Sequence, residues 1–550
     1  MRTVAAAVAT AVAAVLLAAC GGAPPPPAPV ADQAQYDPQP YENLRDGGTL
    51  TVGVREIPAQ LNTFHGDTSG WSENLWPWNN PVLVTYAVDG TPQFNPDYLT
   101  DVRQDVVDGN TRVTYTINPK AHFNDGTPLD WTTLEGTWKA VRGADPAYFL
   151  GVVAGFSRIT SVTRGVDDRQ AVVTFQGGYA GWEGLFRKVL HPKATESAAA
   201  FNTSYVQNMR PEWGAGPYVA KTYDEQHGTV TFERNPQWWG RPGKLDTVVY
   251  EQLESSASIN AFRNGQISYT NVGTKDRLAQ VQGMEGIDLR RGKAAQTGVI
   301  SLNAKSPVLT ELAVRKAVLE GIDRNQLAEI AAQGLGFTEP VSGSLGLIPT
   351  QPGYQDNLAG LLRFDPQQAA KDLDAAGWAA GPDGMRAKAG TPLKFALVVV
   401  GDDVVAKARS LALVAMMKAI GVQLDIRTVA SSEFSKVING REYDMFIWSQ
   451  DQPDPFGMNY LCDLYCTTGS SNLSGTGSPE LDAKLKAIQS VSDPAQQIAQ
   501  GNAVEKEALA QYGLLTTTTL PVLYAVKRGL ANVGALPFTV PLPETIGFEK

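Results

Sequence analysis

The chain has 550 residues, too many for one hydrophobic core, and at about 150 residues per domain its length favours roughly three or four domains. Apolar residues make up 43% of the chain and charged residues 19%, which excludes disorder as the main state. The net charge is -10, from 46 Lys and Arg against 56 Asp and Glu, so a surface built to neutralise nucleic-acid phosphates is not expected.

The N-terminus has the pattern of an export signal. Arg2 precedes an apolar run from Val4 to Ala19, and small residues then lead to Cys20. At 1.5 Å per residue this run spans roughly 24 Å, less than the ~30 Å hydrocarbon core, so a permanent membrane helix is the weaker interpretation. The pattern resembles bacterial lipoprotein precursors, in which the cysteine is lipidated and becomes the mature N-terminus. We expect residues 1–19 to be a signal peptide and Cys20 to carry the lipid anchor.

A proline-rich segment follows the signal. Residues 20–46 contain four consecutive prolines, Pro24 to Pro27, and further prolines with almost no apolar periodicity. This composition predicts an extended, solvated tether. No later segment approaches eighteen consecutive apolar residues, so the rest of the chain is expected to fold at the outer face of a membrane, outside the cytoplasm.

Strands and helices are predicted in chain order through the first half of the body. Alternating apolar and polar residues predict strands at 47–54, 113–117, 172–175 and 229–233. Asp130 follows a strong turn and stands where a helix needs an N-cap, which predicts a helix from there to about Val141. Apolar positions from Leu309 to Leu327 indicate two consecutive helices, with Asp323 capping the second.

The second half predicts strands that alternate with helices. Asp365 caps a helix of about eleven residues that begins with Pro366 and ends before Gly377. Beyond it, the patterns predict a strand, a helix and a strand, then a short helix and another strand, at 395–400, 404–420, 422–429, 432–439 and 443–448. This alternation predicts an α/β lobe with a largely parallel sheet.

Local signatures of enzymes are absent from the sequence. It has no Gly-x-Ser-x-Gly elbow, no Gly-x-x-x-x-Gly-Lys phosphate loop, no complete Gly-x-Gly-x-x-Gly and no His-Glu-x-x-His. Each of the four histidines stands alone, without a second ligand-type residue at metal spacing. We therefore expect no enzyme, no metal site and no cofactor.

Two of the three cysteines, Cys462 and Cys466, lie four residues apart near the C-terminus. One helical turn or a tight loop can bring their Cα atoms within the ~4.4 to 6.8 Å that a disulfide requires, and an oxidising compartment would permit the bond. A redox role is the alternative, although Cys-x-x-Cys spacing is absent.

The segment 445–455 is the most informative candidate for a binding site. An apolar strand containing Trp448 emerges into a loop that carries Asp451 and Asp454. Open α/β sheets bind ligands beyond the carboxyl ends of their strands, and a carboxylate in a dry cleft can pair with an ammonium group. The alternative is that both acids form turns around the neighbouring prolines.

Several short blocks, in order along the chain, match one family. The blocks are Phe123 to Leu129, Gly214 to Tyr218, Arg234 to Trp239, Leu302 to Arg324 and Phe364 to Trp378. The first is similar to the family's aromatic-x-Asp-Gly-x-Pro turn, and the third to its Arg-Asn-Pro-x-Tyr-Trp block. From about Gly47 to beyond Tyr524, the chain resembles the solute-binding lipoproteins of ABC importers in the oligopeptide and dipeptide class, family 5.

The resemblance implies an α/β fold of the two-lobed periplasmic-binding-protein type (type II, the large cluster C form) with an extra inserted domain. The lobes are expected to close on a ligand like a hinged trap. The implied limits are 47–75, 178–298 and 516–550 for lobe I, 76–177 for the inserted domain and 299–515 for lobe II.

The resemblance also implies a function. A monomeric extracytoplasmic receptor would capture peptides or peptide-like solutes and deliver them to an ABC permease. In peptide-binding members an Asp in a Trp-x-x-Asp-x-x-acid-Pro stretch pairs with the peptide α-ammonium, and Asp451 has that place relative to Trp448. The residues expected to bind ligand are Asp451, Trp448, Gln450, Asn303, Trp213 and Trp71. Departures from the family pattern, such as Leu61-Asn62-Thr63 for the usual Leu-Asp-Pro, leave open a cell-envelope scaffold or sensor that is not coupled to transport.

Overall fold

The structure is a computed structural model that describes residues 34–151, 155–293, 295–337, 339–452, 455–538 and 541–550. The segment predicted to be a signal peptide and the predicted lipidation site Cys20 lie outside the described residues. The main sheets have seven and five strands, and a four-stranded sheet forms a third unit. We call the part of the chain around the seven-stranded sheet lobe I, the part around the five-stranded sheet lobe II, and the unit around the four-stranded sheet the extra domain.

Lobe I is built on a mixed sheet in the order β13-β22-β12-β2-β11-β10-β9. Its strands are β2 (Thr49–Val54), β9 (Tyr218–Asp224), β10 (Thr229–Arg234), β11 (Thr247–Gln252), β12 (Tyr269–Asn271), β13 (Ile287–Gly292) and β22 (Val522–Lys527). The central strand β2 runs parallel to β11 and β12 and alternates buried Leu50, Val52 and Val54 with less buried residues. The strands predicted at 47–54 and 229–233 are confirmed as β2 and β10.

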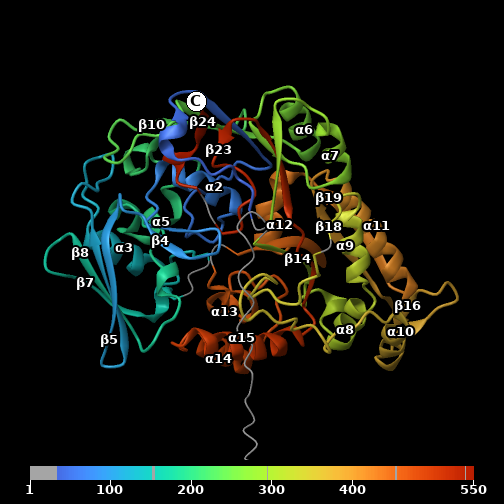
Figure 1. The fold of residues 1–550 in the computed structure, drawn as a ribbon. Coiled ribbons are helices and arrows are strands. Elements are labelled where there is room, and N and C mark those ends of the chain that lie inside the picture. Colours follow the sequence, from blue (N-terminus) through green and yellow to red (C-terminus); the bar gives the residue numbers. More distant parts are fainter. Residues whose placement is uncertain (1–33, 152–154, 294, 338, 453–454, 539–540) are drawn as a thin grey trace, which may run out of the picture.

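Short elements complete lobe I around this sheet. They are α2 (Gly70–Asn79), β3 (Val84–Tyr86), β4 (Pro92–Phe94), α4 (Pro192–Thr195), α5 (Ala198–Thr203), α6 (Ser255–Arg263), α7 (Lys275–Val281) and β23 (Leu530–Ala531). Figure 1 shows α6 and α7 at the top of the molecule, and α2 near its centre, between the extra domain and lobe II.

The extra domain is an antiparallel sheet with one covering helix. Its strands, in the order β5-β6-β8-β7, are β5 (Leu99–Val107), β6 (Asn110–Ile117), β7 (Ile159–Arg164) and β8 (Gln170–Phe175). Helix α3 (Trp131–Val141) packs on β7 and β8, and the Asp130 carboxylate caps it by accepting the Thr132 N–H. The predicted strands and helix are confirmed here, and Figure 1 shows this unit at the left edge.

Lobe II contains a five-stranded sheet in the order β19-β18-β20-β14-β21. Its strands are β14 (Gln296–Leu302), β18 (Lys394–Val400), β19 (Gln423–Val429), β20 (Met445–Asp451) and β21 (Leu514–Thr518). Strand β18 runs parallel to β19 and β20, whereas β14 is antiparallel to β20 and β21. Strand β21 therefore runs in the same direction as β18, β19 and β20, so the prediction of a largely parallel sheet holds for these four strands. It is wrong only for β14, the strand on which the chain enters the lobe.

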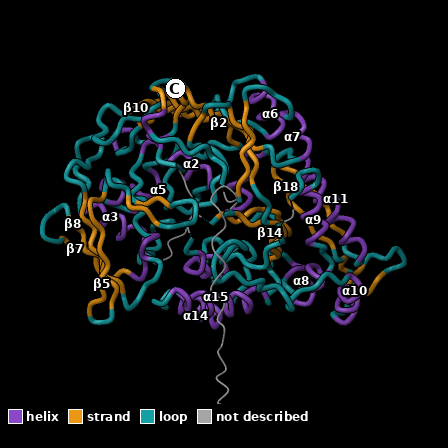
Figure 2. The backbone as a smooth tube through the Cα atoms, viewed as in Figure 1, coloured by secondary structure: helices purple, strands orange, loops and turns teal. Residues whose placement is uncertain are grey.

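Helices surround the lobe II sheet. They are α8 (Leu312–Glu320), α9 (Arg324–Ala332), α10 (Pro366–Ala375), α11 (Val404–Ala419), α12 (Phe434–Gly440), α13 (Leu461–Tyr465), α14 (Pro479–Ile488) and α15 (Pro494–Leu509), with a small sheet of β15 (Ala379–Ala380), β16 (Arg386–Lys388) and β17 (Thr391–Pro392). Asp323 and Asp365 cap α9 and α10 with their carboxylates, as predicted. Figure 2 shows α8 to α11 on the flank of the molecule far from the extra domain.

The chain passes between the two main sheets twice. It leaves lobe I after β13 at Gly292 and enters lobe II at Gln296, and it leaves lobe II at Thr518 and re-enters lobe I at Val522. These changes of sheet lie a few residues from the expected positions, 298 and 516. Each lobe has its own hydrophobic core, so two short connections join two separately packed bodies. Such connections are where hinge motion takes place.

The prediction of a solvated tether up to residue 46 is wrong for its last part. From Ala34 onward the chain packs against lobe I: Gln35 bridges to Ala535, and Leu44 is fully buried. Strand β1 (Leu44–Arg45) pairs with β24 (Gly547–Glu549), because an apolar side chain at residue 44 can anchor the segment in the core. Any tether must therefore end before Ala34. In the described part of the chain, none of the helices has the length and apolar character that crossing a membrane requires.

Candidate ligand-binding site

A cavity of about 340 Å³ lies between the two lobes, and we call it the interlobe cavity. Its volume falls in the range of about 300 to 1,000 Å³ that is usual for small-molecule sites. Lobe I contributes Phe64, Gly70, Glu73, Arg187 and Lys188 to its lining, and lobe II contributes Gln450, Asp451, Gln452, Tyr460 and Asp463. A ligand in this cavity would therefore contact both lobes.

Asp451 lies at the carboxyl end of β20 and lines the interlobe cavity. Gln296 Nε2 donates a hydrogen bond of 2.6 Å to Oδ1, and Oδ2 points toward the first residue of α2, where a Cβ on Gly70 would lie 3.8 Å away. The side chain has an exposed face, but the surrounding protein raises its pKa, and the Gln296 hydrogen bond only partly opposes this effect. In the described part of the chain no Lys or Arg forms an ion pair with it, so this carboxylate is short of positive charge.

Strand β20 is longer than the sequence predicted. It continues past Trp448 to Asp451, because Gln296 pairs with Asp451 in the antiparallel ladder with β14. The prediction of a loop at this point is therefore wrong, and so is the turn-forming alternative for Asp451. Asp454 lies outside the described residues.

Two other predicted residues belong to the same strand. Gln450 lines the interlobe cavity and donates from Nε2 to the Asp451 carbonyl oxygen over 2.8 Å. Trp448 is half-buried, packs against the lobe II core and donates from its indole N–H to Ser301 Oγ at 2.8 Å. It does not line the cavity, so its observed contacts are those of a packing residue.

The structure does not bring Asn303 or Trp213 to the interlobe cavity. Asn303 is buried just after β14, where its amide donates to the Tyr443 carbonyl oxygen at 3.0 Å and accepts from the Lys305 N–H. Trp213 is buried in lobe I and stacks on His191, with ring centroids 5.1 Å apart and an interplanar angle of 8°. Both were chosen from residue type and motif, which do not show where a side chain points.

Trp71 lines a second cavity, of about 370 Å³, which we call the aromatic cavity. Tyr250, Tyr269 and Tyr524 from the lobe I sheet also line it. Consecutive residues at the start of α2 line the two cavities, Gly70 the interlobe cavity and Trp71 the aromatic cavity. Burial, and in smaller part the charge of Asp451, raises the pKa of Tyr524, so Asp451 lies close enough to influence both spaces.

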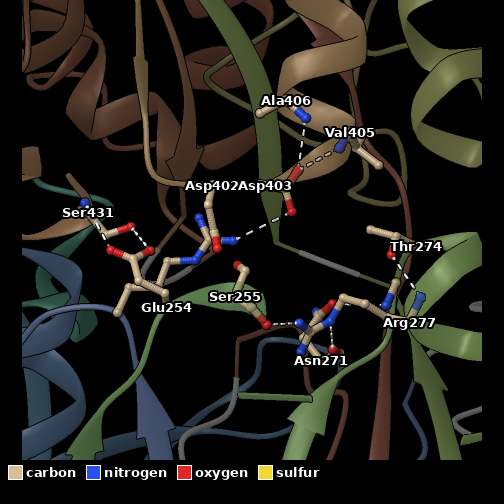
Figure 3. Close-up of polar contacts among 12 residues, drawn as sticks. Glu254, Ser255, Asn271, Thr274, Arg277, Asp402, Asp403, Val405, Ala406 and Ser431 are labelled. Atoms are coloured by element: carbon tan, nitrogen blue, oxygen red, sulfur yellow. Dashed lines mark hydrogen bonds and ion pairs between the residues drawn. The ribbon is translucent and has the colours of Figure 1, made fainter. Parts of the chain in front are cut away.

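Polar contacts join the lobes at the rim of the aromatic cavity (Figure 3). Ser256 Oγ donates to Asp402 Oδ2 at 2.5 Å, and Ser431 Oγ donates to Glu254 Oε2 at 2.6 Å. Asp403, which caps α11, also approaches the Arg55 guanidinium at 3.9 Å. Each of these contacts pairs one residue of lobe I with one of lobe II, so together they favour the closed arrangement seen here.

The lobe I wall of the interlobe cavity carries positive charge. Lys188 forms an ion pair with Glu73, and its Nζ lies 5.4 Å from the centre of the Phe64 ring. Burial lowers the pKa of Lys188, although Glu73 opposes the shift. The neighbouring Arg187 also lines the cavity, and its side chain has no ion pair with the described residues. Sequence patterns did not single out this wall.

Asp463 is a second acid that sequence reasoning missed. It lines the interlobe cavity from α13, and burial raises its pKa to about 7. It lies between Cys462 and Cys466, which the structure joins in a disulfide. An acid between two bonded cysteines was visible in the sequence, but its position on the cavity wall was not. Within the described ranges, no group of three or more His, Cys, Asp or Glu side chains could hold a metal ion.

Comparison with known proteins assigns the chain to a family. The family model described as bacterial extracellular solute-binding proteins, family 5 Middle, matches residues 93–472. The chain belongs to this family. The oligopeptide-binding protein OppA of Mycobacterium tuberculosis is 33% identical to this family 5 protein over 516 residues, which cover 92% of this chain and 85% of OppA. The family predicted from the sequence is therefore confirmed.

Solved structures show the same fold for this solute-binding protein. AppA from Bacillus subtilis, solved in complex with a nonapeptide, has a TM-score of 0.81 at 18% identity, covering 92% of this chain and 100% of AppA. The periplasmic EDTA-binding protein EppA has a TM-score of 0.81 at 20% identity, covering 94% of this chain and 98% of EppA. The predicted two-lobed fold is confirmed, and the family assignment makes this an extracytoplasmic solute-binding protein.

Proposed function

We propose that the protein captures peptides or peptide-like solutes between its lobes and delivers them to the permease of an ABC importer. The observation that carries this proposal is the carboxylate of Asp451, which lines a cavity between the lobes and has no positively charged partner in the described part of the chain. OppA, a relative of this protein, is named as an oligopeptide-binding protein, and the structure of AppA was solved with a nonapeptide. Both observations support peptides as the ligand class.

Binding requires no chemical step. The ligand α-ammonium pairs with Asp451, which Gln296 holds in position. At the opposite wall, Arg187 offers a guanidinium to ligand carbonyl or carboxylate oxygens, while the charge of Lys188 is already compensated by Glu73. A micromolar Kd needs only about -8 kcal/mol net. Because the ligand contacts both lobes, it binds the closed state more tightly and shifts the equilibrium toward it.

We further propose that the protein is a monomer held by a lipid on Cys20 at the outer face of the cell membrane. The order of charged, apolar and small residues before Cys20 supports the anchor. The packing of the chain from Ala34 onward leaves only the short proline-rich segment between the anchor and lobe I.

Native mass spectrometry of the freshly purified chain, followed by calorimetry with peptide pools, tests the proposal. We expect co-purified masses that match peptides and saturable binding of the pool. A chain that carries no ligand, binds no peptide and instead retains a partner protein would favour the scaffold or sensor alternative. Turnover of bound peptides by the pure protein would contradict a purely binding role.

A further inference from the structure

The side chain of Asp463 is an unpaired acid on the wall of the interlobe cavity. It is half-buried as a whole, and its Oδ2 atom is buried with no hydrogen-bond partner. No ion pair joins its carboxylate to the residues that the structure describes. A buried polar atom without a partner costs free energy, about 1 to 3 kcal/mol and more when charged, so a positive ligand group that paired with this carboxylate from the cavity would be stabilising.

Several contacts hold the backbone around Asp463 in place. The disulfide joins the residues Cys462 and Cys466, and the Cys466 N–H donates to the Cys462 carbonyl oxygen at 2.8 Å. The Ser471 N–H donates to the backbone oxygen of Asp463 itself at 3.0 Å. A backbone fixed in this way needs little reorganisation when a ligand arrives, which lowers the cost of binding.

The two cavity acids of lobe II lie on different elements, Asp451 on β20 and Asp463 on α13. Burial raises the pKa of Asp463, and no ion pair joins it to a cation of the described residues. The other charged groups on the cavity wall are Glu73, Arg187 and Lys188, all on lobe I.

The acids on the helices that pack against α13 have partners of their own. Asp482 of α14 accepts from Thr467, and Glu505 of α15 accepts from Tyr465 Oη at 3.0 Å. Tyr460, just before α13, is the remaining titratable group that lines the cavity on this side. The carboxylate of Asp463 therefore remains available for a ligand.

We propose that Asp463 forms a second cation subsite, which takes the ammonium or guanidinium of a Lys or Arg side chain of the bound peptide while Asp451 takes its α-ammonium. The proposal rests on the proposed peptide-binding function. A ligand with a single positive group could pair with only one of Asp451 and Asp463. A peptide with a basic side chain could pair with both. The protein would then select basic peptides rather than accept all side chains equally.

Calorimetry with matched tripeptides tests the selection. The probes are Ala-Ala-Ala and the six peptides that carry one Lys or one Met at each position, since Met has similar length without charge. At pH 8 we expect at least one Lys peptide to bind about tenfold more tightly than its Met counterpart. Asp463→Asn should abolish this ratio and leave the affinity for Ala-Ala-Ala unchanged. Asp105→Asn, on an exposed strand of the extra domain, is the matched control and should preserve the ratio.

The wild-type chain supplies a second readout that does not depend on a variant. Since the pKa of Asp463 lies at about 7 in the free protein, acidification from pH 8 to pH 6 protonates most of it. The ratio of Lys to Met affinities should then fall by about fivefold, because most of the acid is neutral at pH 6 and a neutral acid no longer attracts the cation. Melting temperatures of Asp463→Asn and wild type, compared at pH 8, should show the variant at least as stable, because it removes a buried carboxylate that has no partner.

Three results would overturn the subsite. These are equal binding of every Lys and Met pair by the wild type, a Lys preference that survives in Asp463→Asn, and a Lys preference that does not change between pH 8 and pH 6. Binding of Ala-Ala-Ala in any of these cases would leave the peptide function standing. Failure of all seven peptides to bind would refute the function and the subsite together.

Discussion

Replacing Asp451 with Asn should remove most of the affinity for a peptide with a free N-terminus. Asn keeps an oxygen that can accept the Gln296 hydrogen bond, so the change removes the charge and little of the shape. Truncating one member of a buried charge pair typically costs about 2 to 5 kcal/mol, and each 1.4 kcal/mol is a factor of about ten in Kd. The lower limit of about 2 kcal/mol corresponds to roughly 25-fold in Kd, so a loss of less than tenfold would contradict the pairing.

A double-mutant cycle by calorimetry distinguishes the loss of the ion pair between Asp451 and the ligand ammonium from a general loss of binding. The wild type and Asp451→Asn are each titrated with a peptide and with its N-acetylated form, which lacks the ammonium. We expect acetylation to weaken binding to the wild type by at least tenfold and to have almost no effect on Asp451→Asn, because the partner charge is already gone. An equal effect of acetylation in both proteins would refute the pairing of Asp451 with the ligand N-terminus.

The same pair predicts a pH dependence. Burial raises the pKa of Asp451 in the free protein, so its carboxylate takes up a proton at a higher pH than an ordinary Asp. A bound ammonium favours the charged form and lowers that pKa again. Peptide affinity should therefore fall as the pH falls through the range of the raised pKa, and it should be almost constant over the same range in Asp451→Asn.

Three further changes test the closed arrangement and the stability of lobe II. Ser431→Ala removes the hydrogen bond to Glu254 across the lobes, so small-angle scattering of the free protein should give a larger radius of gyration, and an unchanged radius would contradict a role in closure. Asp365→Ala removes the N-cap of α10 and should lower the free energy of unfolding by about 1 kcal/mol in a denaturant titration, whereas no change would mean that the cap contributes nothing. Replacing Cys462 and Cys466 with Ser opens a short loop, and the loss should be about 2 kcal/mol, with an unchanged melting temperature as the contrary result.

Local signals in the sequence predicted local structure well. Asp130, Asp323 and Asp365 each stand before an apolar helical pattern, and the structure shows each one capping a helix with its carboxylate. Such a cap depends on the three or four residues that follow it, which the sequence displays directly. The strand at 47–54 was equally clear, because its alternation reflects one buried face.

Features that depend on distant segments were not predicted. The reversed direction of β14 follows from the path of the chain between lobes, and the interlobe cavity brings together Lys188 of lobe I and Asp463 of lobe II, which are far apart in the sequence. Asn303 was assigned to the site from its motif, but its side chain turns toward the backbone of Tyr443 instead. Only the fold brings such residues together, so residue type and spacing could not assign them.

A crystal structure of the full-length or lipid-free chain with a bound peptide would show whether Asp451 binds the ligand N-terminus between the lobes. We expect density for the ligand in the interlobe cavity, with its α-ammonium within hydrogen-bond distance of an Asp451 carboxylate oxygen. A ligand whose amino end lies away from Asp451, or that binds outside the space between the lobes, would contradict the account.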